Sequence, residues 1–237
     1  MVNIWSKFSQ TVFPPTCLLC DGRSDQGQLL CSGCLGDLPR ILNACLQCGI
    51  EQVASEALTQ TVCGQCQREP PPVTRTLCFG LYEPPLDYLI LQLKFHAQLA
   101  VAPLLAGLLA QKIRGAEPQL PLALIPVPLH PTRLAERGYN QAGELARALG
   151  HELGLPTMPN LVRRTRHTEA QSALPAKERR KNMHDAFEVV GGDVPAHVAI
   201  VDDVMTTGTT VWEMAKTLKQ AGAQRVDAWI IARTPMG

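Results

Sequence analysis

The sequence predicts an α/β fold with a mainly parallel sheet, preceded by a small cysteine-rich module. Beyond residue 72, short apolar runs typical of buried strands alternate with segments that have the apolar spacing of helices. Eight of the nine cysteines fall within the first 66 residues. Pro70, Pro71 and Pro72 stand between the two parts and favour an extended linker. We therefore expect one unit over residues 1–69 and a second over 70–237.

The order of elements after the prolines supports the parallel sheet. Strands are expected at 75–83, 122–128, 187–190, 197–204 and 226–233, and helices at 86–95, 101–114, 140–153 and 209–221. Gly154 and Gly222 end the last two helices, and Pro103 fits only within the first turn of its helix. Ligands of such sheets bind beyond the carboxyl ends of the strands, which directs attention to the loops after Pro128 and Val201.

The overall composition excludes several classes of protein. Hydrophobic residues make up 46 % of the 237 residues, which is too many for a disordered chain. The net charge of +1 provides no general attraction to nucleic acid or membrane. The start of the chain has no apolar run typical of a secretory signal, and the longest apolar stretch, 99–110, is shorter than the ~20 residues that span a bilayer. We expect a soluble cytoplasmic protein.

The paired cysteines predict zinc sites. Four Cys-x-x-Cys pairs are present, Cys17/Cys20, Cys31/Cys34, Cys45/Cys48 and Cys63/Cys66. Each pair supplies two thiolates from one tight turn, so two pairs complete a tetrahedral Zn²⁺ site, and the whole set predicts two structural ions. Sequential grouping would join the first two pairs and then the last two; nested and interleaved groupings are also possible, and the sequence does not choose among them. A set of redox or structural thiols and an iron–sulfur cluster are the alternatives, and Cys78 is expected to be a buried small apolar residue.

A phosphate-binding loop is predicted at the end of the strand over 197–204. Two acids close the strand, a loop of hydroxyls with one glycine follows, and a helix begins at once; the residues are Asp202, Asp203, Thr206, Thr207, Gly208, Thr209 and Thr210. The helix N-terminus offers unpaired N–H groups to an anion, and glycine allows a close approach of the backbone. The acids would accept hydrogen bonds from sugar hydroxyls beside the phosphate. The alternative is an ordinary strand–turn–helix with exposed acids.

Two further clusters carry cationic side chains. Arg133 and Arg137 stand four residues apart and share a face on a helical turn, where their guanidinium groups suit phosphate oxygens. His130 either joins them or only caps and packs. A basic stretch follows over 163–182, which includes Arg164, and it forms either a solvated face or a flap that closes on pyrophosphate or nucleic acid. No aromatic residue is interleaved there, which weakens a stacking platform for single strands.

The motif from Asp202 to Thr210 resembles the ribose-phosphate signature of type I phosphoribosyltransferases. Nearly the whole chain is similar to the ComF family of competence-associated proteins, which includes the bacterial proteins called GntX. The resemblance rests on the paired cysteines, Leu93-Lys94-Phe95, Pro126 to His130, Arg137 to Gln141, Arg164 to Gln171, Arg179-x-x-Asn182, Phe187 and the loop at Asp202. Tyr139 stands where phenylalanine is common.

The resemblance implies a type I phosphoribosyltransferase fold that follows a double zinc ribbon. It also implies that the chain binds phosphoribosyl pyrophosphate. Asp202 and Asp203 would contact the ribose 2′- and 3′-hydroxyls, and the residues from Thr206 to Thr210 would hold the 5′-phosphate. The pyrophosphate would be neutralised by His130, Arg133, Arg137 and Arg164, with Mg²⁺ held largely by the ligand. Catalysis would depend on Asp202, Asp203, Arg133 and Arg137 through positioning and charge stabilisation.

The family is linked to the handling of incoming DNA, and three functional hypotheses follow. Under the first hypothesis, the chain is an active transferase with an unknown acceptor. Under the second, it is a sensor that binds phosphoribosyl pyrophosphate or a nucleotide without turnover. Under the third, it is an adaptor of DNA uptake. An adaptor would hold single-stranded DNA or a motor protein through its zinc ribbons and basic residues. Contacts to DNA or protein are the expected role of the zinc ribbons.

Overall fold

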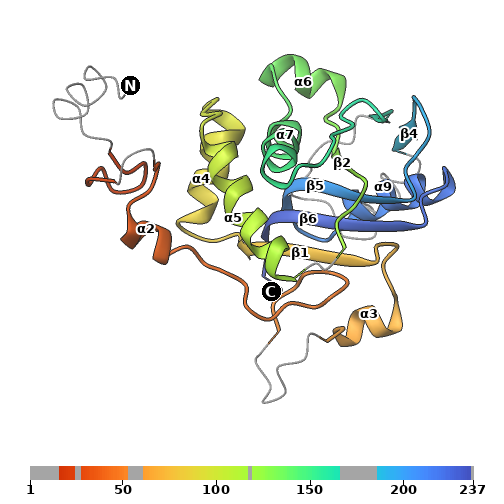
Figure 1. The fold of residues 1–237 in the computed structure, drawn as a ribbon, viewed down its shortest axis with the longest axis horizontal. Helices are drawn as coiled ribbons and strands as arrows, with labels where there is room; N and C mark the ends of the chain where they lie inside the picture. Colours follow the sequence, from red (N-terminus) through yellow and green to blue (C-terminus); the bar gives the residue numbers. More distant parts are fainter. Residues whose placement is uncertain (1–15, 25–27, 53–60, 117–118, 166–185, 236–237) are drawn as a thin grey trace.

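A four-stranded parallel sheet forms the centre of the molecule in a computed structural model, which describes residues 16–24, 28–52, 61–116, 119–165 and 186–235. The strand order is β1 (Arg75–Leu81), β6 (Arg225–Arg233), β5 (His197–Met205) and β2 (Ala123–Pro126). Each neighbouring pair runs parallel (Figure 1). The predicted α/β class with a mainly parallel sheet is therefore confirmed.

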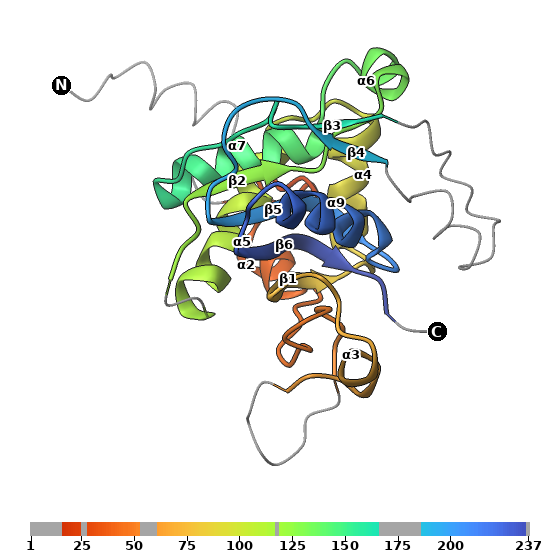
Figure 2. The ribbon, with the colours of Figure 1, turned by 90° about the vertical axis from the view of Figure 1, so that its right-hand side faces the viewer.

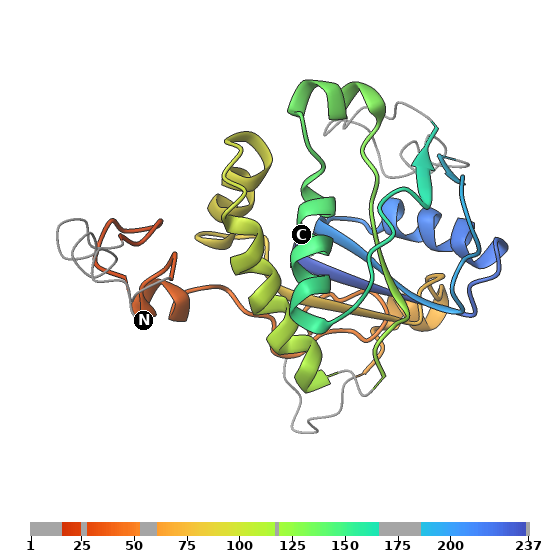
Figure 3. The same ribbon diagram turned by 45° about the horizontal axis from the view of Figure 1, so that its top comes forward.

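Helices cover both faces of this sheet. Helices α4 (Leu86–Phe95), α5 (Val101–Ala116) and α7 (Gln141–Leu153) lie on one face, and α9 (Thr209–Gln220) lies on the other (Figures 1 and 3). Trp229 and Ile231 of β6 pack toward the three helices, whereas Ala228 and Ile230 pack toward α9. The side chains of a strand alternate between the faces of a sheet, so the apolar run of β6 fills two cores.

The boundaries of the main elements lie within two residues of those expected from the sequence. Local signals explain this accuracy. Asn140 caps α7 by accepting a hydrogen bond from the Ala142 N–H at 3.1 Å, and Gly154 ends it in the left-handed conformation with φ 69°. Pro103 is the third residue of α5, where its missing N–H costs no hydrogen bond.

Short elements were missed, and one expected strand belongs elsewhere. The elements not predicted from the sequence are α2 (Ser32–Gly36), α3 (Gly64–Arg68), α6 (Pro131–Arg137) and β3 (Val162–Arg164). The expected strand at 187–190 is β4 (Phe187–Val189), and it pairs antiparallel with β3 outside the main sheet. Elements of three to seven residues are too short to show a period, so the apolar pattern of the sequence does not reveal them.

The cysteine-rich part of the chain returns to the edge of the sheet. The N–H of Ile41 donates to Phe79 O at 3.1 Å, and the N–H of Leu81 donates to Pro39 O at 2.8 Å. Residues before the proline run are thus hydrogen-bonded to β1, and the division of the chain at residue 70 stays a prediction.

Within the described residues, no helix combines the length and apolar character that crossing a membrane requires. Most of the basic stretch expected over 163–182 falls outside the described residues, which resume at 186. Arg163 and Arg164 are the members of that stretch that the structure describes, both on β3.

Candidate functional site

The acid pair lies near the carboxyl end of β5. Asp203 is 3 % exposed, and its Oδ1 lies 3.1 Å from Nζ of Lys94, at the end of α4. Its other oxygen, Oδ2, is buried and has no hydrogen-bond partner among the described residues. Asp202 is half-buried, and its Oδ1 accepts a hydrogen bond from the N–H of Asp203 at 2.9 Å. A buried acceptor without a donor is costly, and it gives this site capacity for a donor from a ligand.

The environment of Asp202 favours its neutral form. Burial is the first cause and the charge of Asp203 the second, and together they raise the pKa of Asp202 from 3.8 to about 8. Lys94 and Arg164 oppose the rise because their positive charges stabilise the carboxylate. The ligand-free site therefore carries less negative charge than its two acids suggest.

The loop after β5 leads directly into the N-terminus of α9. Gly208 has φ 80° and stands as the N-cap of the helix without a side-chain capping bond. The hydroxyls of Thr207 and Thr209 lie 2.8 Å apart, and both residues are half-buried. The first amides of α9 and these hydroxyls can donate to an anion, as expected for a phosphate loop.

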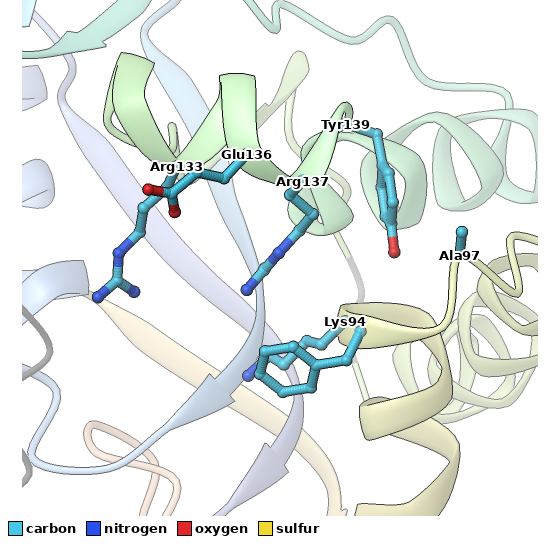
Figure 4. A pocket seen from close by; sticks show the side chains of 7 residues that line it. Lys94, Ala97, Arg133, Glu136, Arg137 and Tyr139 are labelled. Carbon is cyan, nitrogen blue, oxygen red and sulfur yellow. The ribbon is translucent and has the colours of Figure 1, made fainter.

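Cations from α6 and α4 converge on a pocket of about 550 Å³. Arg137 points from α6 toward Lys94 at the end of α4, and Arg133 extends from the same helix farther from α4 (Figure 4). Arg137 is held in place, because its Nη1 donates to Gln141 Oε1 at 2.5 Å and its guanidinium lies 5.2 Å from the Phe95 ring centre. The pocket is lined by Lys94, Phe95, Ala97, Arg133, Glu136, Arg137 and Tyr139.

Arg164 belongs to the same cationic cluster. Burial is the main cause that lowers its pKa, and the charge of Arg133 lowers it further, while Asp202 raises it. Its guanidinium lies 5.8 Å from the ring centre of Phe187, its neighbour across the β3–β4 pair. The structure therefore brings Arg133, Arg164 and Asp202 close enough to interact, although they come from separate elements.

His130 has a local structural role. Its Nδ1 accepts a hydrogen bond from the Thr132 N–H at 3.3 Å and so caps α6. Its assignment to pyrophosphate stays a prediction.

Lys94 and Phe95 line the pocket but were not predicted from the sequence as site residues. Both stand in Leu93-Lys94-Phe95, which the family resemblance contained, but nothing in the residue pattern placed this segment beside Asp203. Tyr139, another residue of the pocket wall, donates a hydrogen bond from its hydroxyl to Leu93 O and thereby ties the start of α7 to α4.

The cysteines form two groups, and of the groupings that the sequence left open the structure has the sequential one. In each group, the Sγ atoms lie within 4.8 Å of one another; the groups are Cys17, Cys20, Cys31, Cys34 and Cys45, Cys48, Cys63, Cys66. The Sγ atoms of Cys20 and Cys31 are 3.8 Å apart and those of Cys48 and Cys63 are 3.7 Å apart. A tetrahedron with Zn–S bonds of about 2.3 Å has edges of about 3.8 Å, so both groups fit a structural Zn²⁺ with four thiolates.

In the second group, hydrogen bonds to Cys45 favour the thiolate form of this one cysteine. The Cys63 N–H lies 3.2 Å from Cys45 Sγ, and a hydrogen bond from the Cys48 side chain is the first cause that lowers the pKa of Cys45. Cys78 lies apart from both groups, is fully buried in β1, and has a pKa raised to about 12 by burial, as its apolar surroundings require.

The cysteine-rich part of the chain matches a known family, and most of the chain is similar to named proteins. Residues 8–67 match the model of the double zinc ribbon domain. Competence protein F of Haemophilus influenzae is 38 % identical over 212 residues, which cover 86 % of this chain and 90 % of that protein. DNA utilization protein YhgH of Salmonella typhimurium is 37 % identical over 209 residues, with the same shares covered. Competence protein ComFC of Streptococcus pneumoniae is 26 % identical over 208 residues, 86 % of this chain and 87 % of that protein.

Solved structures of phosphoribosyltransferases are also similar to part of the chain. The purine phosphoribosyltransferase of Pyrococcus horikoshii matches with a TM-score of 0.35 and 21 % identity, over 59 % of this chain and 84 % of that one. Glutamine phosphoribosylpyrophosphate amidotransferase of B. subtilis matches with a TM-score of 0.37 and 19 % identity, over 55 % of this chain and 26 % of that one. The fold assignment above rests on the strand order and the packing of the helices.

Proposed function

This chain belongs to the family of competence protein F and DNA utilization protein YhgH, and from that premise we propose that it binds phosphoribosyl pyrophosphate at the carboxyl end of β5. One observation carries the proposal. Two adjacent acids, one with a buried oxygen that lacks a donor among the described residues, stand between a hydroxyl-rich helix N-terminus and a cluster of arginines. A ribose with a phosphate on either side is complementary to this arrangement, because its hydroxyls donate to the acids and its phosphates face the helix N-terminus and the arginines.

Each part of the ligand has a matching group. The carboxylates of Asp202 and Asp203 accept hydrogen bonds from the 2′- and 3′-hydroxyls, so that the unpaired Oδ2 gains a donor. Thr206, Thr207, Gly208, Thr209 and Thr210 hold the 5′-phosphate with amides and hydroxyls. Arg133, Arg137 and Arg164 neutralise the pyrophosphate. Mg²⁺, carried by the ligand oxygens, supplies charge neutralisation of the leaving pyrophosphate.

Lys94 is the ion-pair partner of Asp203 beside this ligand. Its Nζ lies 3.1 Å from Asp203 Oδ1, and removal of that charge would leave a buried carboxylate without any partner among the described residues. In a transfer reaction, the developing positive charge at the anomeric carbon would lie near the acid pair, and the arginines would stabilise the departing oxygens. The acceptor would enter through the pocket beside Phe95 and Tyr139.

The test is calorimetric titration of phosphoribosyl pyrophosphate with Mg²⁺ into the zinc-loaded protein and into Asp202→Ala/Asp203→Ala. Charge alone predicts tighter binding of this anion once two acids are removed. A decrease in affinity of tenfold or more would therefore show that contacts to the ribose have been lost. The matched control is Asp37→Ala/Asp193→Ala, which removes two exposed acids elsewhere and is expected to bind as the wild type does. Equal affinity in all three proteins would exclude the ribose site.

A part in DNA uptake or use is the second proposal, and it comes from the names of the relatives. The cations at Arg133, Arg137 and Arg164 suit a phosphodiester backbone as well as a pyrophosphate. If single-stranded DNA uses this cluster, its affinity falls steeply with salt, and phosphoribosyl pyrophosphate competes with it. Binding of DNA that is insensitive to both would assign the DNA to another surface or to a protein partner.

A further inference from the structure

The segments that carry the second cysteine group pack against the edge of the sheet. We call these segments, residues 43–52 and 61–68, the second cysteine unit; they contain Cys45, Cys48, Cys63 and Cys66 (Figure 2). Thr76 of β1 donates from its N–H to Leu46 O at 2.8 Å and from its hydroxyl to Gln47 O at 2.6 Å. Gly49 has φ 67°, and a Cβ there would lie 2.6 Å from Cys78 Sγ. The turn between Cys45 and Cys48 thus fits closely against β1.

Arg233 links this unit to the candidate phosphate loop. It stands at the end of β6 and is 6 % exposed. Its Nε donates to the carbonyl of Cys48 at 3.1 Å, and its Nη1 donates to the carbonyl of Met205 at 3.0 Å and to that of Thr206. One guanidinium therefore joins a cysteine of the second unit to the first residue of the loop, and its planar fork fixes their relative positions.

Trp212 forms a second link. It lies in the first turn of α9 and packs against the apolar cluster of Cys45, Cys48, Ile50 and Cys66. Its ring is also so close to the loop that a Cβ on Gly208 would come within 2.6 Å of it. The indole fills the space between the thiols and the backbone of the loop, and its Nε1 is buried with no partner among the described residues.

The first cysteine group shows no such link in the described residues. Cys17 and Leu30 pack into the core on the side of α4 and α5, away from α9 (Figures 1 and 3). The backbone bonds near its thiols stay within the unit: Cys17 N–H to Gly22 O at 2.7 Å and Leu18 N–H to Leu29 O at 2.8 Å. The two units have the same ligands and similar sulfur spacing, so one serves as an internal control for the other.

We propose that the second cysteine unit is a brace for the phosphate loop, and that Arg233 and Trp212 are the positioning residues through which zinc in this unit holds the loop in its binding geometry. This inference rests on the proposed function only where it concerns the ligand. A metal joining four thiolates fixes the carbonyl of Cys48 and the surface on which the indole rests. Loop amides held ready for an anion bind it more tightly than amides that must first be ordered.

The experiment compares Cys66→Ser with Cys34→Ser, each of which removes the last thiolate of one unit. Bound zinc is counted by a colorimetric chelator, amide exchange of 206–211 is followed by mass spectrometry, and affinity for phosphoribosyl pyrophosphate with Mg²⁺ is measured by calorimetry. Both variants are expected to lose about one zinc. Only Cys66→Ser is expected to show exchange of the loop at least tenfold faster and affinity at least tenfold weaker. Equal effects of the two variants, or an unchanged loop in Cys66→Ser, would overturn the proposal.

Two further variants keep the test decisive if Cys66→Ser does not fold. Trp212→Ala leaves all eight thiols in place and should speed exchange of 206–211 with full zinc content, whereas Trp212→Phe should restore slow exchange because it refills the space beside Gly208. Exchange of 198–201 in β5 reports global stability and should not change. If Trp212→Ala alters β5 as much as the loop, the role of the indole is general packing and the proposal is wrong. The exchange measurement needs no ligand, so it stands even if the protein does not bind phosphoribosyl pyrophosphate.

Discussion

Buried acids at the two ends of the central strands differ in how many of their carboxylate oxygens are paired. At the start of β6, Asp227 is fully buried; its Oδ2 lies 2.7 Å from His197 Nε2 and 2.9 Å from Arg225 Nη2. Its Oδ1 accepts from Arg225 Nε at 3.2 Å, so both oxygens have partners. Near the end of β5, Asp203 is 3 % exposed, but among the described residues only one of its oxygens is paired, with Lys94. Because an unpaired buried acceptor costs free energy, the difference separates an acid whose partners lie within the fold from an acid that the proposed function assigns to a ligand.

The largest effect is expected from Asp227→Ala. Arg225 and His197 share the carboxylate of Asp227, and the substitution removes this shared acceptor. Breaking a buried ion pair in this way costs about 3–5 kcal/mol. Urea unfolding monitored by circular dichroism measures the loss. At temperatures where the variant is folded, its affinity for phosphoribosyl pyrophosphate should equal that of the wild type.

Glu188→Ala is the control for Asp227→Ala, because it breaks the exposed pair of Glu188 with Arg163 at 3.0 Å. Its effect on the free energy of unfolding should stay within about 0.5 kcal/mol. A similar loss in both variants, or weaker ligand binding in Asp227→Ala, would remove the distinction between the two ends of the strands.

Asp202→Asn is expected to stabilise the ligand-free protein at high pH. The pKa of Asp202 in the folded chain is about 8, above its ordinary value of 3.8, so the folded state holds this proton more tightly than the unfolded state does. Its stabilising contribution is complete below pH 4 and is lost as the pH rises toward 8. Asparagine cannot ionise, so the variant should exceed the wild type at pH 8 by on the order of 1–3 kcal/mol.

Unfolding by urea at several pH values between 4 and 9 measures this difference. Ionisable groups far from residue 202 are the same in both proteins and cancel in the comparison. A difference between variant and wild type that does not change with pH would show that the environment of Asp202 does not favour its neutral form. At pH 9, where Asp202 is mostly ionised, the same variant should bind phosphoribosyl pyrophosphate less tightly, because a neutral amide accepts more weakly from the ribose hydroxyls than a carboxylate does.

The smallest effect is expected from His130→Ala. Loss of its cap on the Thr132 N–H should cost about 1 kcal/mol, with little change in affinity for phosphoribosyl pyrophosphate. His130→Asn retains a capping acceptor and should recover most of the stability. If His130→Ala instead weakens ligand binding more than tenfold at unchanged stability, the imidazole contacts the pyrophosphate, as the family resemblance implied.

The sequence by itself determined the features that depend on neighbours along the chain. The spacing of Cys-x-x-Cys fixes two thiols on one turn, and the succession of strand, acid pair, Thr-Gly-Thr loop and helix defines the candidate phosphate loop. Apolar periods and capping residues such as Asn140 and Gly154 placed the long elements within two residues. These signals are local, so they can be recognised without knowledge of the fold.

Only the tertiary structure decided which distant residues meet. It grouped the cysteines in sequence order, paired Lys94 with Asp203, and brought Arg233 to Cys48, 185 positions away. The spacing left the groupings of the cysteines open, because each grouping gives four thiolates. Strand order and helix packing determine which distant residues become partners, and both depend on the burial of the whole apolar surface. The residues next to each partner in the sequence therefore do not reveal the pairing.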